Sequence, residues 1–142
     1  MLIGVPKEIK SDEYRIGLTP ESVETLTQSG HEVMIEQNAG LGIGKDNKAY
    51  EDAGAEIVPT REEIFQRAEM IVKVKEPQLD ECALLRSDQI LFTYLHLAPD
   101  PEQVKALLAS GCRAIAYESV KADDGSYPLL TPMSEVAGRM AV

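Results

Sequence analysis

Short apolar runs alternate along the chain with longer segments whose apolar residues recur at helical spacing. The runs are rich in valine and isoleucine, which is typical of buried strands. Six strands are predicted, at Leu2–Val5, Val33–Glu36, Glu56–Val58, Met70–Val74, Ile90–Tyr94 and Arg113–Tyr117. Because a helical pattern separates successive strands, we expect parallel pairing. The predicted fold is α/β, with a doubly wound, mostly parallel sheet of Rossmann-like or flavodoxin-like type.

Boundary signals support this alternation. A small residue followed by glycine stands at three predicted helix-to-strand joints, at Gly30, Gly54 and Gly111, where a helix end favours a left-handed residue. Two helices have start signals, Thr19-Pro20 and Asp100-Pro101. These signals indicate repeated βα units.

Two lysines interrupt the strand pattern in "MIVKVKEPQ", residues 70–78. Strict alternation places Lys73 and Lys75 on the face that carries Ile71. A solvated sheet face would explain both lysines, and so would an anion held at the end of the strand, just before Pro77. Lys75 is nearer the exit and is therefore the better candidate for a ligand contact.

Ligands of doubly wound sheets bind beyond the carboxyl ends of the strands, where Arg15, Lys75 and His96 follow three predicted strands. Arginine offers a planar fork for a carboxylate, although Asp12 and Glu13 offer ordinary ion pairs. Lysine can bind a carboxylate, polarise a carbonyl or form a Schiff base, and histidine, with a pKa of ~6.5, suits proton transfer. The alternatives are a solvated edge for Lys75 and a polar core margin for His96. We expect all three side chains to converge on one crevice.

Two other features have simpler interpretations. The glycines of "AGLGIGKDN" fall at 40, 42 and 44, which does not match the G-x-G-x-x-G dinucleotide fingerprint, so a tight turn is predicted. Glu118 ends the last strand and is either a carboxylate near the site or a surface partner of Lys121.

Composition narrows the functional classes. The chain has 142 residues, 44% of them apolar, and a net charge of −10, which fits one domain with a core and disfavours nucleic acid and anionic membranes as partners. No apolar run approaches the ~20 residues of a membrane span, and the first residues lack a signal pattern, so a cytoplasmic location is expected. Cys82 and Cys112 fit no metal or redox spacing, and no metal-ligand cluster is recognised.

Four motifs in order carry a family resemblance. They are "GVPKEIKSDEYRIGLTPESVETLTQSGHEV", "EMIVKVKEPQ", "LFTYLHLAPDPE" and "PLLTPMSEVAGRMAV", and together they resemble the amino-terminal part of alanine dehydrogenases. The resemblance implies NAD as cofactor, L-alanine, pyruvate and ammonium as substrates and products, and a homo-oligomer, usually a hexamer. It also implies that Arg15 and Lys75 hold the substrate, that His96 is the acid/base, and that Ser134 touches NAD.

Related families leave alternatives open. Transhydrogenases and saccharopine dehydrogenases share the architecture, but transhydrogenases lack Lys75-Glu76-Pro77 and Leu95-His96-Leu97. Mild departures from the family pattern occur at Ser11 and Asp12, where asparagines are usual, and at Ile16-Gly17, which replaces Val-Ala. A non-catalytic module that binds small carboxylates or assembles subunits would use the same fold.

Length sets the expected domain organisation. By resemblance, residues 1–130 form the first segment of the substrate-binding domain, and residues 131–142 begin a helix that leads to an absent NAD-binding domain. Thr131-Pro132 is the start signal, and no stop signal follows. NAD would be bound mainly by the missing domain, so this chain alone is expected not to turn over alanine.

Overall fold

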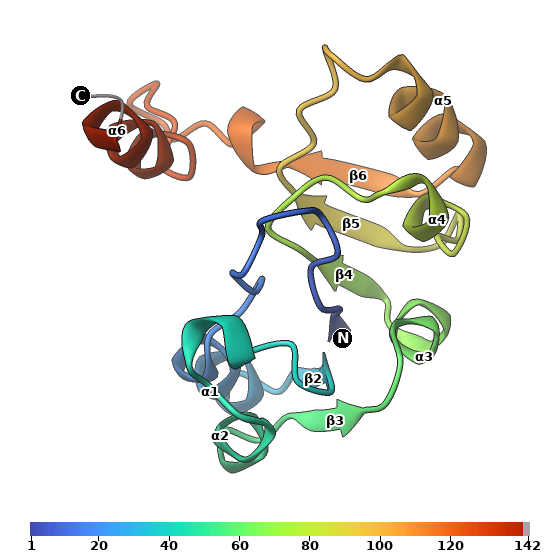
Figure 1. Ribbon diagram of the computed structural model, residues 1–142, viewed down its shortest axis with the longest axis vertical. Coiled ribbons are helices and arrows are strands. Elements are labelled where there is room, and N and C mark those ends of the chain that lie inside the picture. The colour runs from blue at the N-terminus through green and yellow to red at the C-terminus, as the bar shows by residue number, and fades with distance from the viewer. Residues whose placement is uncertain (141–142) are drawn as a thin grey trace.

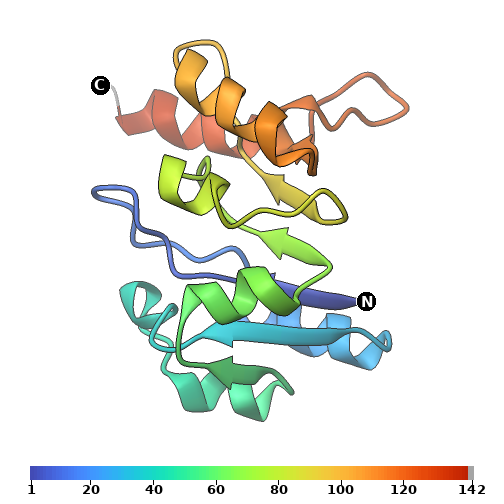
Figure 2. The same cartoon turned by 90° about the vertical axis from the view of Figure 1, so that its right-hand side faces the viewer.

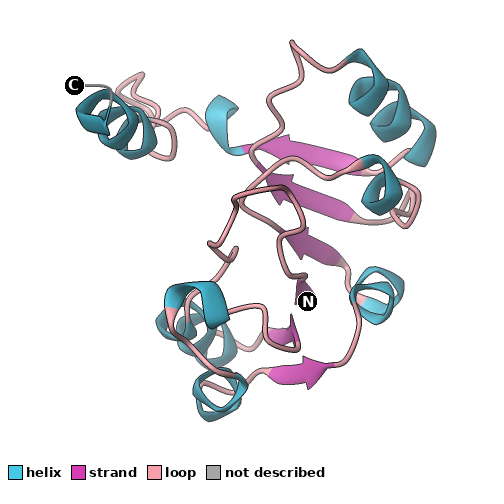
Figure 3. Ribbon diagram, in the orientation of Figure 1, coloured by secondary structure: helices cyan, strands magenta, loops and turns pink. Residues whose placement is uncertain are grey.

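The computed structural model describes residues 1–140 as a six-stranded parallel sheet covered by helices on both faces (Figures 1 and 3). The strand order is β3-β2-β1-β4-β5-β6. The strands are β1 (Leu2–Val5), β2 (Glu32–Glu36), β3 (Glu56–Val58), β4 (Met70–Val72), β5 (Ile90–Thr93) and β6 (Arg113–Ala116). The predicted fold class is confirmed, and the order is the Rossmann one, with the switch point between β1 and β4.

The helices begin and end where local chemistry favours it. Thr19 accepts a hydrogen bond from the Ser22 N–H, and Asp100 accepts one from the Gln103 N–H. Gly30, Gly54 and Gly111 all adopt positive φ, as predicted. The helices are α1 (Pro20–Gln28), α2 (Asn47–Asp52), α3 (Arg61–Arg67), α4 (Leu79–Cys82), α5 (Pro101–Ser110) and α6 (Thr131–Met140), with short 3₁₀ helices at η1 (Leu41–Ile43) and η2 (Tyr117–Ser119).

Three strands end earlier than predicted. β4 stops at Val72 instead of Val74, β5 at Thr93 instead of Tyr94, and β6 at Ala116 instead of Tyr117. The reason is clearest for β4, because the Val74 N–H donates to the carboxylate of Glu8 rather than to a neighbouring strand. The apolar pattern continues beyond the last residue of each of these strands.

The core has two layers, one on each face of the sheet. Helices α1 and α2 cover one face, while α3, α4 and α5 cover the face toward the viewer of Figure 2. Ile3, Val33 and Val72 pack on the first side, and Ile71 and Leu91 pack on the second. A Cβ on Gly4 would lie 2.5 Å from Ile64, so glycine allows α3 to approach β1 closely.

The glycine-rich stretch forms the predicted tight turn. Gly40 precedes η1, and Gly44 ends it with a φ of +73°. Cys82 is buried and Cys112 is half-buried, both as free thiols. No helix within residues 1–140 has the length and apolarity needed to cross a membrane.

Helix α6 begins at Thr131, where the start signal predicted it. It stands away from the strands, on the other side of the sheet from α5 (Figure 1). The prediction extends this helix to 142, but residues 141 and 142 lie outside the described part of the chain.

Candidate active site

Two adjacent cavities lie beyond the carboxyl ends of β1, β4 and β5. The first, here called the polar cavity, has a volume of about 470 Å³ and is lined by Lys10, Lys75, Glu76, Tyr94, His96, Glu118, Leu130, Met133, Ser134 and Ala137. The second, the apolar cavity, has a volume of about 560 Å³ and contains Arg15 among mostly apolar residues. Tyr94 and Met133 line both.

The structure therefore brings Lys75, His96 and Ser134 together and places Arg15 next door. Arg15 reaches the shared wall, because its Nη1 lies 3.3 Å from the Sδ of Met133. Of the three residues predicted to share one crevice, two line the polar cavity itself.

The fork of Arg15 is filled by Glu13. Nε donates to Glu13 Oε1 at 2.8 Å and Nη2 donates to Oε2 at 2.5 Å. This bond holds the pKa of Glu13 below its ordinary value, and the charge of Lys75 contributes in the same direction. Glu13 thus lies within the field of both cations, and of the two interpretations of Arg15, the structure contains the ion pair with a neighbouring acid.

Lys75 follows β4 and is half-buried. Its carbonyl accepts a hydrogen bond from the Thr93 hydroxyl at 2.8 Å, which fixes its backbone against β5. Within residues 1–140 its ammonium forms no side-chain ion pair, unlike that of Lys73, and the residue lines the polar cavity. This cation is available to a ligand.

Lys73 has a different environment. It is fully buried, and its Nζ donates to Glu8 Oε2 at 3.1 Å and to Glu81 Oε1 at 2.8 Å. We call Glu8, Lys73 and Glu81 the buried triad. Neither a solvated face nor an exit anion explains Lys73; both predictions are wrong for this residue, because its partners are two internal carboxylates.

His96 occupies an unusual backbone position. Its φ is +45°, a left-handed conformation that costs a non-glycine residue about 1–3 kcal/mol and persists only when its surroundings impose it. Glu118 imposes it here, accepting the N–H of His96 at 2.8 Å and that of Leu95 at 3.1 Å. Glu118 also lines the polar cavity, so it belongs to the site, and no ion pair joins it to Lys121 in the described chain.

Sequence reasoning missed Tyr94 and Met133. Tyr94 packs edge-to-face on Tyr117, which in turn packs on Phe92, and burial raises the pKa of both tyrosines. The Tyr94 hydroxyl donates to the carbonyl of Leu129, which ties the segment before α6 to the sheet. The available signal was the position of Tyr94 at a strand exit, directly before Leu95-His96.

Ser134 enters the polar cavity from α6. Leu130, Met133 and Ala137 form an apolar wall around it, and Lys75 and His96 lie among the polar lining. A flat heteroaromatic ring with a polar substituent fits such a wall and hydroxyl. No group of three or more acidic, histidine or cysteine side chains in residues 1–140 is arranged to hold a metal ion.

Comparison with known proteins places this chain in a family. The family model for the alanine dehydrogenase/PNT N-terminal domain matches residues 4–137. The alanine dehydrogenase of Methanococcus maripaludis is 56% identical over 142 residues, which is 100% of this chain and 38% of the relative. That of Bacillus subtilis is 55% identical over 141 residues, covering 99% and 37%. The chain therefore spans a little over one third of the length of these relatives.

Solved structures agree. An L-alanine dehydrogenase superposes with a TM-score of 0.94 at 53% identity, covering 100% of this chain and 39% of the other. A transhydrogenase from Sinorhizobium meliloti superposes with a TM-score of 0.77 at 28% identity, covering 83% and 35%. On this evidence the chain belongs to the alanine dehydrogenase/PNT N-terminal domain family.

Proposed function

We propose that this chain forms the substrate-binding part of an NAD-dependent L-alanine dehydrogenase, which interconverts L-alanine, NAD and water with pyruvate, ammonium and NADH. The observation that carries the proposal is the polar cavity, where Lys75 and His96 meet Ser134. The high identity to alanine dehydrogenases supports it.

Each side chain has a role in this proposal. Lys75 binds the carboxylate and stabilises charge on the reacting oxygen. Arg15 binds the same carboxylate, which requires the ligand to replace Glu13 in the guanidinium fork or to use the Nη1 that faces Met133. His96 exchanges protons with the substrate nitrogen and oxygen.

NAD fits the remaining wall. The hydroxyl of Ser134 and the apolar side chains of Met133 and Ala137 would hold its nicotinamide end. When bound, NAD supplies the acceptor for the hydride of the α-carbon. We assign residues 1–130 to the substrate domain. The residues that follow, beginning at 131, form the start of the connecting helix. Most of the cofactor contacts are assigned to a separate domain.

The chain's own residues complete the reaction around the substrate. Loss of the hydride leaves an iminium ion, which water attacks to form a carbinolamine. His96 removes a proton from the attacking water, gives it to the amino group that leaves as ammonia, and takes up the proton of the carbinolamine hydroxyl as the carbonyl forms. The Lys75 ammonium lies beside the oxygen on which charge develops.

The test is an NADH absorbance assay of the full-length gene product with pyruvate and ammonium. We expect NADH oxidation that requires both substrates. Hydride transfer between two nucleotides, without a keto acid, would instead establish the transhydrogenase alternative. Pyruvate binding without turnover would establish a non-catalytic carboxylate module.

Assembly and location follow the same reasoning by resemblance. We propose a cytoplasmic homo-oligomer, a hexamer in the family pattern. Sedimentation velocity of the full-length gene product should give a single hexameric species, and a monomer would contradict this part of the proposal.

A further inference from the structure

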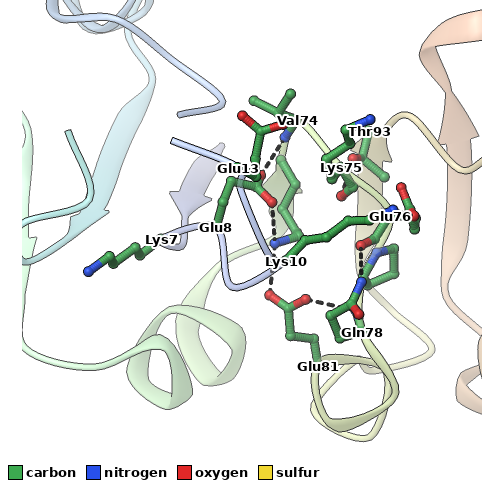
Figure 4. A network of polar contacts seen from close by, with 12 residues as sticks. Lys7, Glu8, Lys10, Glu13, Val74, Lys75, Glu76, Gln78, Glu81 and Thr93 are labelled. Carbon is green, nitrogen blue, oxygen red and sulfur yellow. Dashed lines mark hydrogen bonds and ion pairs between the residues drawn. The ribbon is translucent and has the colours of Figure 1, made fainter. Parts of the chain in front are cut away.

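The segment that carries Lys75 is held at both ends by carboxylates of the buried triad (Figure 4). Glu8 Oε1 accepts the N–H of Val74 at 2.6 Å, and Glu81 Oε2 accepts the N–H of Gln78 at 2.8 Å. Val74 directly precedes Lys75, and Gln78 follows it three positions later. The Thr93 hydroxyl fixes the Lys75 carbonyl between them.

Lys73 joins these two anchors. Its ammonium binds the second oxygen of each carboxylate, so every oxygen of Glu8 and Glu81 has a donor. The three side chains are at most 1% exposed. The triad thereby connects the loop after β1, the end of β4 and the first turn of α4.

Stability is a poor explanation for this arrangement. Taking three charges out of water is costly, and apolar residues of equal volume often stabilise a core as well or better. Apolar residues cannot, however, accept the N–H groups of Val74 and Gln78 in fixed directions. What the triad provides, and apolar residues could not, is therefore a fixed position for residues 74–78.

We propose that Glu8, Lys73 and Glu81 are positioning residues, which aim the ammonium of Lys75 into the polar cavity without touching substrate. The inference rests on the proposed function for the role of Lys75. It assigns the first of the two lysines in "KVK" to holding the second.

The test compares Glu8→Ala with Glu8→Gln in the full-length gene product. In both variants Lys73 keeps Glu81 as its counter-ion, so no single charge is left buried alone. In Glu8→Ala we expect the KM for pyruvate to rise about tenfold with the KM for NADH unchanged, because Lys75 loses its anchor. Glu8→Gln retains an acceptor oxygen, so its KM for pyruvate should stay within about threefold of the wild-type value.

Glu36 provides the matched control. Its carboxylate is also partly buried and accepts a loop N–H, that of Lys7 at 2.8 Å, next to Glu8 in the chain, but within residues 1–140 no hydrogen bond or ion pair joins it to residues 74–78. Glu36→Ala should leave the KM for pyruvate unchanged. A purely structural role for Glu8 would lower stability without this selective change in KM.

A second readout does not depend on turnover. The rate at which acetic anhydride labels Lys75, measured by mass spectrometry against exposed Lys48 and Lys105, reports how firmly its segment is held. In Glu8→Ala this rate should rise by about threefold or more, and in Glu36→Ala it should not.

The outcomes are separable. Wild-type KM for pyruvate together with wild-type labelling of Lys75 in Glu8→Ala overturns the positioning proposal, as does an equal change in Glu36→Ala. If the wild-type gene product shows no NADH oxidation, the proposed function fails, and the labelling rate alone decides: a rise supports positioning and no change overturns it.

Discussion

At the end of β4, Lys73 is fully buried between two carboxylates, whereas Lys75 is half-buried and lines the polar cavity. Both are lysines on the same apparent face of the same strand exit. They differ in their partners. Lys73 forms ion pairs with Glu8 and Glu81, whereas no charged side chain in the described chain pairs with Lys75. A charge in a strand becomes structural or available for chemistry according to the elements that cover it.

The largest expected effect lies on the cavity side, at His96. His96→Ala should lower kcat of the NADH-dependent reaction by roughly 10²–10⁴-fold, because general acid/base catalysis contributes about that much. His96→Asn controls for the left-handed backbone, which asparagine tolerates, and should lose as much activity. Turnover within about threefold of wild type in both variants would remove His96 from the acid/base role.

The two lysines should differ most in stability. Lys73→Met leaves Glu8 and Glu81 buried without a cation and should cost about 3–5 kcal/mol, whereas Lys75→Met should cost less than about 1 kcal/mol. Urea unfolding followed by circular dichroism measures both. Similar losses at the two positions would erase the distinction between them.

Arg15 should show an intermediate effect on the cavity side. Arg15→Lys keeps the charge but removes the fork, so the KM for pyruvate should rise about tenfold while cofactor binding is retained. Arg67 forms a comparable fork on the surface, with Glu56, and Arg67→Lys serves as the control. An unchanged KM in Arg15→Lys would leave Arg15 only its ion pair with Glu13.

The smallest effect concerns pH. Burial raises the pKa of Glu8 above its ordinary 4.5, so its contribution to stability is present below that value and is lost as the pH rises through the window above it. The bond from Arg15 lowers the pKa of Glu13, so its contribution is present above 4.5 and is lost as the pH falls below it.

The wild-type protein should therefore lose stability through Glu8 as the pH rises above 4.5, and Glu8→Gln should not show this loss. It should lose stability through Glu13 as the pH falls below 4.5, and Glu13→Gln should not show that loss. The Glu13 effect should be under about 1 kcal/mol, because water screens the partly exposed Arg15. Urea midpoints from about pH 3 to pH 7 test the two signs. The same slope in both variants would contradict them.

The sequence predicted the local features well. Strand positions, the helix caps at Thr19 and Asp100 and the left-handed glycines depend on neighbours within a few residues, which a linear pattern contains. The strand exits were misjudged, since Val74 bonds to a carboxylate 66 positions away. No periodicity records such a distance.

The candidate site shows the same division. Lys75 and His96 were recognisable because each follows a strand and carries a reactive group. Two contacts could not be predicted: Glu118 accepts the N–H of His96, and Glu13 pairs with Arg15. Both depend on how the loops fold, which residue type and spacing do not determine. From the sequence, the ion pair with Glu13 is one of two interpretations of Arg15, and binding of a substrate carboxylate is the other.

The β1–β4 ladder is short, with Ile3 opposite Met70 and Gly4 opposite Ile71. A slip of one residue in β4 would reverse the faces of its side chains and turn Lys73 toward the apolar layer of Val5 and Val33. The two carboxylates would then be left buried without their cation, a penalty of several kcal/mol. The ion pairs of Lys73 therefore favour the observed register over the shifted one, in a ladder that has only two residue pairs in residues 1–140.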